Sequence, residues 1–107
     1  MVDVDQLADP VVRKFVEAVN AGDRDAFFAL LTPDATMSDD GSDRDLTEWV
    51  DRELFSAEGR MEVESQSDDG RSLIVNVTNS THGTMRTHWE FTVEGDRVAR
   101  FETGQAG

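Results

Sequence analysis

The sequence predicts an α+β fold in which three helices precede an antiparallel sheet. In the first half of the chain, apolar residues recur with the helical period of about 3.6 residues. From Met61 onward they alternate with polar residues, as in half-exposed strands. A run of helices followed by a run of strands is typical of the α+β class. The 107 residues suffice for a single domain over 1–107 and leave little room for a second.

The first predicted helix begins at Pro10 and ends before Gly22. Asp9 can cap it, and proline suits the first helical position because its φ is already helical. Apolar side chains then follow at spacings of one and three residues, which places them on one face: Val11, Val12, Phe15, Val16 and Val19. The polar residues 1–8 before the helix are expected to be frayed.

Two shorter helices and one strand are predicted next. The second helix begins after Asp23 and ends before Pro33. Residues 35–38 predict a short strand, and residues 39–43 a loop. The third helix is expected over 44–54, where its buried residues would be Leu46, Trp49, Val50 and Leu54.

The second half of the chain predicts four strands joined by tight turns. They are expected over residues 61–65, 72–78, 84–93 and 97–103. Asp68-Asp69-Gly70 and Glu94-Gly95-Asp96 supply hairpin turns with glycine where positive φ is needed. Alternation in the third of these strands separates an apolar side (Met85, Thr87, Trp89, Phe91, Val93) from a polar side (Arg86, His88, Glu90, Thr92).

Composition excludes several classes of function. The chain has no cysteine, two histidines and no glycine-rich phosphate loop, so we expect neither a metal site nor a cofactor. A formal charge of −13 repels phosphate backbones and anionic lipids, which makes nucleic acids and membranes poor partners. No long apolar run and no secretory signal is present, and we expect a cytoplasmic protein.

The loop after the first predicted strand is acidic, with Asp39, Asp40, Asp43, Asp45 and Glu48 close together. It is not an EF-hand calcium loop. With Gly41 at the required glycine, threonine or serine occupies the first, third and twelfth positions. We expect a solvated loop in which Asp43 or Ser42 caps the third helix. The histidines His82 and His88 are expected at the surface or in an interface.

Aromatic residues are numerous for so short a sheet: Phe15, Phe27, Phe28, Trp49, Phe55, Trp89, Phe91 and Phe101. Most of them are expected in the core. Helices folded against one concave face of a sheet also leave a pocket lined by such groups. The sequence therefore predicts a pocket between the helices and the sheet.

Residues 12–36 resemble the opening of the nuclear-transport-factor-2-like superfamily, which includes ketosteroid isomerases and SnoaL-type polyketide cyclases. The resemblance rests on the helix end Asn20-Ala21-Gly22-Asp23 and on the step Pro33-Asp34-Ala35 into the first strand. It extends over nearly the whole chain in the order of elements. It implies a cystatin-like cone, in which a curved antiparallel sheet is wrapped by three N-terminal helices around a deep pocket. The fold by itself does not define an activity.

Ketosteroid isomerases supply the nearest chemical template. By resemblance, their catalytic base corresponds to Asp39, and a carboxylate at a strand end that faces an apolar pocket can act as a general base. Phe15 stands where those enzymes have an oxyanion-binding tyrosine, and losing one such donor costs about 10²–10³ in rate. Counting from the final turn places His88 near the second oxyanion position, whereas strand parity places Trp89 on the apolar side. Steroid isomerisation is therefore not expected.

Three functions remain open. The first is binding of an apolar small molecule in a pocket formed by Phe15, Val19, Trp49, Thr87 and Trp89, with Asp39 as a polar anchor at its mouth. The second is an isomerase or cyclase in which Asp39 is the general base. The third is an interaction module that uses the outer sheet face, with Arg86, His88, Glu90 and Arg100. Because members of the superfamily often dimerise through the sheet, a homodimer is compatible with all three.

Overall fold

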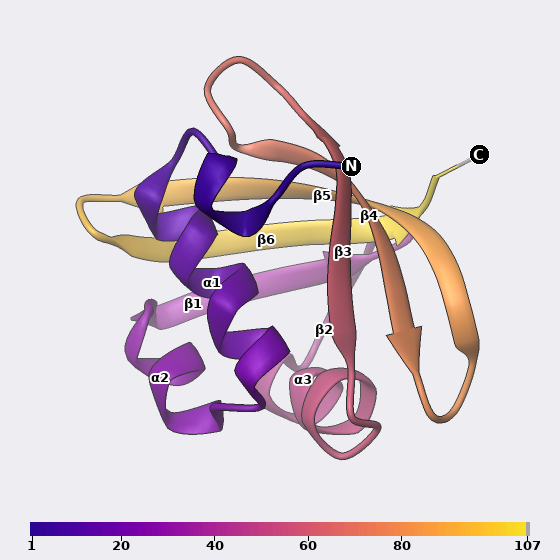
Figure 1. Ribbon diagram of the computed structural model, residues 1–107. Coiled ribbons are helices and arrows are strands. Elements are labelled where there is room, and N and C mark those ends of the chain that lie inside the picture. Colours follow the sequence, from indigo (N-terminus) through magenta and orange to yellow (C-terminus); the bar gives the residue numbers. More distant parts are fainter. Residues whose placement is uncertain (107) are drawn as a thin grey trace.

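One six-stranded sheet curves around the helices and holds them on its concave face (Figure 1). The computed structural model describes residues 1–106. Its elements follow in the order η1 (Val4–Gln6), α1 (Pro10–Ala21), α2 (Arg24–Ala29), β1 (Leu31–Asp39), β2 (Ser42–Arg44), α3 (Leu46–Val50), η2 (Asp51–Phe55), β3 (Arg60–Gln66), β4 (Ser72–Asn79), β5 (Gly83–Glu94) and β6 (Arg97–Gln105). The predicted α+β class, with three helices before most of the sheet, is confirmed.

The sheet is mixed rather than wholly antiparallel. Its strand order is β2-β1-β6-β5-β4-β3, and β1 runs parallel to β6, whereas every other neighbouring pair is antiparallel. Alternation along a strand identifies its buried face but not its partner. The parallel pairing was therefore missed, because hairpin signals join only strands that follow one another along the chain.

The helix starts follow the predicted caps. The side chain of Asp9 accepts the N–H groups of Val11 at 2.8 Å and Val12 at 3.2 Å, and Gly22 ends α1 with a φ of 66°. Asp23 likewise caps α2. The cap of α3 is Asp45, so the expectation that Asp43 or Ser42 would cap the third helix is wrong. These two residues lie instead in β2.

The region between α2 and α3 differs most from the prediction. Strand β1 begins at Leu31 and passes through Pro33, where the register with β6 shifts. A proline without an N–H is tolerated in a strand at such an irregularity. The expected loop over 39–43 is a tight hairpin. Asp40 and Gly41, with φ of 51° and 83°, form its two-residue turn.

Residues 1–8 are attached to the domain rather than frayed. Leu7 is buried in the core, and the N–H of Val2 donates to the carbonyl of Val63 at 2.9 Å. The N–H of Ala8 donates to the side chain of Gln66 at 2.9 Å. The expectation failed because the segment adds backbone hydrogen bonds to β3, which its polar composition does not reveal.

Asp9 connects α1 to the β3–β4 turn. Besides capping the helix, its carboxylate lies 2.9 Å from Nε of Arg71 and is 7% exposed. Burial favours the neutral acid, but the hydrogen bonds from Arg71 and from the helix N–H groups outweigh it and lower the pKa of Asp9. Ionised Asp9 therefore stabilises the junction of the helix with the sheet.

Aromatic rings fill the space between α1 and the sheet. The ring of Phe15 lies 4.7 Å from that of Phe27, 4.9 Å from Phe91 and 5.3 Å from Phe101. All four side chains are buried. Across residues 1–106, no helix combines the length and the apolar character that a membrane crossing requires.

Candidate functional site

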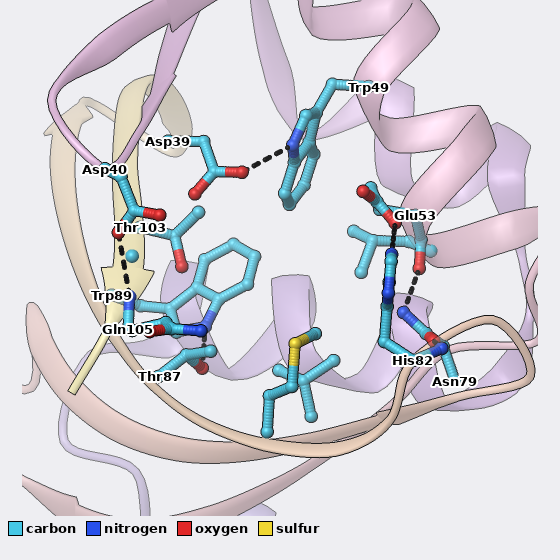
Figure 2. A pocket seen from close by; sticks show the side chains of 14 residues that line it. Asp39, Asp40, Trp49, Glu53, Asn79, His82, Thr87, Trp89, Thr103 and Gln105 are labelled. Atoms are coloured by element: carbon cyan, nitrogen blue, oxygen red, sulfur yellow. Dashed lines mark hydrogen bonds and ion pairs between the residues drawn. The ribbon is translucent and has the colours of Figure 1, made fainter. Parts of the chain in front are cut away.

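A pocket of about 180 Å³ opens beside this core, where η2 faces the ends of β1, β4, β5 and β6 (Figure 2). Its apolar lining comes from Trp49, Leu54, Val77, Met85 and Trp89. Its polar lining comes from Asp39, Asp40, Glu53, Asn79, His82, Thr87, Thr103 and Gln105, and Gly104 completes it. The pocket thus has a mixed lining, in which apolar side chains meet polar ones that include three acids.

Two tryptophans form the apolar interior. Their rings meet edge to face, with centroids 6.2 Å apart. Nε1 of Trp89 donates to the hydroxyl of Thr87 at 2.9 Å, and this hydroxyl donates to the carbonyl of Val75 at 2.8 Å. Nε1 of Trp49 donates to Oδ2 of Asp39 at 3.1 Å. Since both indole N–H groups already have acceptors, the rings offer a ligand apolar and π surface rather than donors.

Asp39 is the last residue of β1 and is half-buried. It pairs with Thr103 of β6 across the parallel part of the sheet. The next residue, Asp40, donates its N–H to the carbonyl of Thr103 at 2.9 Å and accepts the N–H of Gln105 at 3.0 Å. These bonds fix the backbone on either side of the turn, so the carboxylate of Asp39 is held in place beside Trp49.

A second polar group lies across the pocket from Asp39 (Figure 2). The carboxylate of Glu53 is 3.5 Å from Nε2 of His82 and 3.7 Å from Nε of Arg52. Asn79 accepts the N–H of His82 at 2.7 Å and donates to the carbonyl of Glu53 at 3.3 Å. Asn79 thereby ties the β4–β5 turn to η2 and keeps the histidine near the carboxylate.

Sequence reasoning missed this second group. Glu53 lies in η2, a π-helical turn that continues α3 with a wider backbone spacing. A helix of regular period does not predict which side chain of such a turn faces the sheet. His82 was expected at the surface, and it is indeed partly exposed, but at the rim of the pocket. The one available signal was Asn79 at a strand end, where asparagine often bonds nearby backbone.

The predicted site residues divide into two sets. Asp39, Trp49, Thr87 and Trp89 line the pocket. Phe15 and Val19 do not: both are buried in the core and lie outside the lining of this pocket. Helix α1 packs directly on β3 and β6, so its aromatic face fills that part of the concave sheet and leaves no room for a ligand.

Strand parity correctly predicted which side of β5 faces the core. Thr87 and Trp89 are buried, whereas His88 pairs with Ile74 and Gly104 in the sheet and lines a shallow hollow on the outer face. His88 is therefore not at the second oxyanion position. Asn76 also belongs to the outer face, because its neighbours Val75 and Val77 are buried.

The outer sheet face carries paired charges. Nη2 of Arg86 lies 2.8 Å from Oε2 of Glu64, and Nη2 of Arg100 lies 2.8 Å from Oδ1 of Asp43. Met1 is the one large apolar side chain that is exposed within residues 1–106. These ion pairs make the part of the face around them polar, whereas the centres of permanent dimer interfaces are mostly apolar. A homodimer through this sheet stays a prediction.

A curved sheet wrapped by three helices, with a pocket at the open end, defines the nuclear-transport-factor-2-like class of proteins. The model of the SnoaL-like domain matches residues 12–106, and the chain belongs to this family. None of the curated proteins compared with the chain matches it.

Solved structures agree on the fold. A candidate polyketide cyclase from Sinorhizobium meliloti superimposes with a TM-score of 0.76 at 23% identity, covering 95% of this chain and 99% of that one. An NTF2-like protein of unknown function from Cytophaga hutchinsonii superimposes with a TM-score of 0.74 at 14% identity, covering 99% of this chain and 92% of that one. A candidate ketosteroid isomerase from Kribbella flavida superimposes with a TM-score of 0.73 at 17% identity, covering 95% of this chain and 79% of that one. At these identities the likeness establishes the fold and no activity.

Proposed function

We propose that the protein binds a small molecule with a compact apolar body in the pocket between Trp49 and Trp89. The observation that carries this proposal is the pocket itself, in which two indole rings, Val77 and Met85 meet a few fixed polar groups. An apolar interior with few, well-placed polar groups is typical of ligand sites. The family assignment supports the proposal, because related folds host small-molecule enzymes.

The size of the pocket limits the ligand. A cavity of roughly 150 Å³ in another protein accepts benzene. The pocket of about 180 Å³ therefore suits a single substituted ring, and larger ligands would extend out of its mouth. A flat tetracyclic body is larger than this volume and would have to extend out of the mouth.

Filling the pocket should weaken binding. Met85 is half-buried in the pocket wall, and Met85→Trp places a larger side chain where the ligand ring would lie. We expect this variant to weaken the binding of single-ring probes, such as phenol, benzyl alcohol and benzylamine, by at least about tenfold. Isothermal titration calorimetry measures the change.

The matched control is Val93→Trp. Val93 is also half-buried and lies on the same side of β5, but outside the pocket. Its replacement should leave the affinity unchanged. If none of these probes binds the unmodified protein, or if both variants bind them equally well, the proposed pocket is not the binding site.

A second candidate function is acid–base catalysis by Asp39. The supporting observation is that Asp39 lies inside the pocket, fixed by the indole of Trp49, with His82 on the opposite side. A positioned carboxylate can remove a proton from a bound carbon acid. The candidate cyclases and isomerases with this fold are consistent with such a step.

A carbon acid that needs only one base tests this candidate. In 5-nitrobenzisoxazole, removal of the ring C–H proton by Asp39 would form a nitrile and break the N–O bond, which releases a coloured phenolate. We expect turnover above the buffer rate and a loss of about 10²-fold or more in Asp39→Asn. Equal rates for the two proteins would refute general-base catalysis by Asp39 and leave the binding proposal intact.

A further inference from the structure

We propose that the ligand of this pocket is a cation, an amine whose ammonium group pairs with Asp39 while its apolar body lies against Trp49 and Trp89. This inference rests on the proposed binding function and names the chemical class of the ligand. It is carried by the charges that face the pocket and by the hydrogen bonds that those groups already make.

Asp39 is half-buried without a countercharge. Within residues 1–106, its carboxylate forms no ion pair, and its one side-chain hydrogen bond comes from the neutral indole of Trp49. Neither lysine nor arginine lines the pocket in the described part of the chain. Removing a carboxylate from water is costly unless an opposite charge or further hydrogen bonds compensate it. A ligand ammonium group would supply both.

The other charged groups at the pocket do not supply this compensation. Two basic side chains, Arg52 and His82, lie near Glu53 on the opposite side of the pocket, and both already face its carboxylate. Asp40 adds a further negative charge at the rim, where it accepts the N–H of Gln105. The formal charge of −13 strengthens the attraction of cations to the whole molecule.

The indole rings favour the same class of ligand. Both N–H groups are occupied, by Asp39 and by Thr87, so these two largely buried indoles contribute carbon and π surface, not donors, to the pocket wall. A ring of tryptophan attracts a cation more strongly than other aromatic side chains do. An apolar group attached to the ammonium would cover the remaining ring surface. An anion would meet carboxylates on both sides of the pocket.

Three probes of equal ring size test this inference: benzylamine, benzyl alcohol and benzoate. Each carries one polar carbon substituent on a benzene ring, which is positively charged in benzylamine, neutral in benzyl alcohol and negatively charged in benzoate. We expect the unmodified protein to bind benzylamine roughly ten- to a hundredfold more tightly than benzyl alcohol, and benzoate most weakly, because hydrogen bonds between charged groups are the stronger ones. Calorimetry gives the affinities. The indole N–H signals of Trp49 and Trp89 in a ¹⁵N spectrum report whether the probe lies in the pocket.

The variant Asp39→Asn keeps the shape of the side chain and removes its charge. It should reduce the affinity for benzylamine to about that for benzyl alcohol, and it should change the affinity for the alcohol far less. The control Asp96→Asn changes the total charge equally, but Asp96 is exposed in the β5–β6 turn and does not line the pocket. This control should retain the preference for the amine.

The outcomes separate the inference from the proposed function. If the unmodified protein binds the alcohol and the amine equally well, the ligand of this pocket is not selected for positive charge. The proposal that the pocket binds a small molecule is then retained. A preference that Asp96→Asn removes as fully as Asp39→Asn overturns the inference of a cationic ligand as well, because total charge then explains the preference. If none of the three probes shifts the indole signals, both the proposed binding function and the inference of a cationic ligand are refuted. The comparison of probes on the unmodified protein holds even if Asp39→Asn does not fold.

Discussion

Replacing Phe15 with alanine is expected to lower the free energy of unfolding by about 3–5 kcal/mol. The Phe15 side chain is fully buried, and its ring contacts those of Phe27, Phe91 and Phe101, with Trp89 at 5.9 Å. Truncation removes contacts on every side and leaves a cavity that the rigid sheet cannot close. Urea denaturation followed by circular dichroism measures the change.

Phe28 provides the control for this experiment. It is half-buried at the end of α2 and makes one close ring contact, to Phe27 at 5.4 Å. Phe28→Ala is expected to cost roughly 1 kcal/mol. If Phe15→Ala costs no more than this and weakens ligand binding instead, Phe15 lines a ligand pocket and is not a core residue.

Replacing Gly70 with alanine is expected to cost about 2–5 kcal/mol, of which 1–2 arise from backbone strain and the rest from overlap. Gly70 has a φ of 72°, where a Cβ atom is unfavourable. That atom would also lie 2.6 Å from the backbone nitrogen of Asp9 and 3.0 Å from Cβ of Ala8. The N-terminal segment would have to move away from the β3–β4 turn. Chemical denaturation again provides the measurement.

Gly95 separates the two causes. It has a similar φ of 62° in the β5–β6 turn, but a Cβ atom there meets nothing within 4 Å. Gly95→Ala should therefore cost only the backbone strain, about 1–2 kcal/mol. Equal costs for the two variants would show that the close approach of the N-terminal segment to Gly70 contributes nothing to stability.

Features set by neighbouring residues were predictable from the sequence. The caps Asp9 and Asp23 and the stop at Gly22 act through hydrogen bonds and φ values within one turn of helix. The alternation around Trp89 specified the buried side of β5, because a strand has only two faces. The resemblance of residues 12–36 to a known superfamily added the fold, which the family match confirms.

Features set by distant contacts were not predictable. An apolar side chain at position 15 suits either a pocket or a core, and only the position of α1 on the sheet decides between them. The approach of Glu53 to His82 depends on a π-helical turn and on the β4–β5 hairpin together. Asp39 is a candidate because the resemblance to ketosteroid isomerases points to it, and nothing in its local sequence pattern distinguishes it from the other acids of that loop.

The parallel pairing of β1 with β6 has a consequence for the order in which the chain can assemble. Thr36 and Arg100, which hydrogen-bond across these strands at 2.9 Å, are 64 residues apart in sequence. Strands β3 to β6 can form from consecutive hairpins, whereas docking of β1 requires closure of a long loop, which is entropically costly. Asp39 lies on β1 and pairs with Thr103 of β6. A chain in which only the hairpins had formed would therefore lack one wall of the pocket, so the complete pocket exists only once the longest-range pairing of the sheet is made.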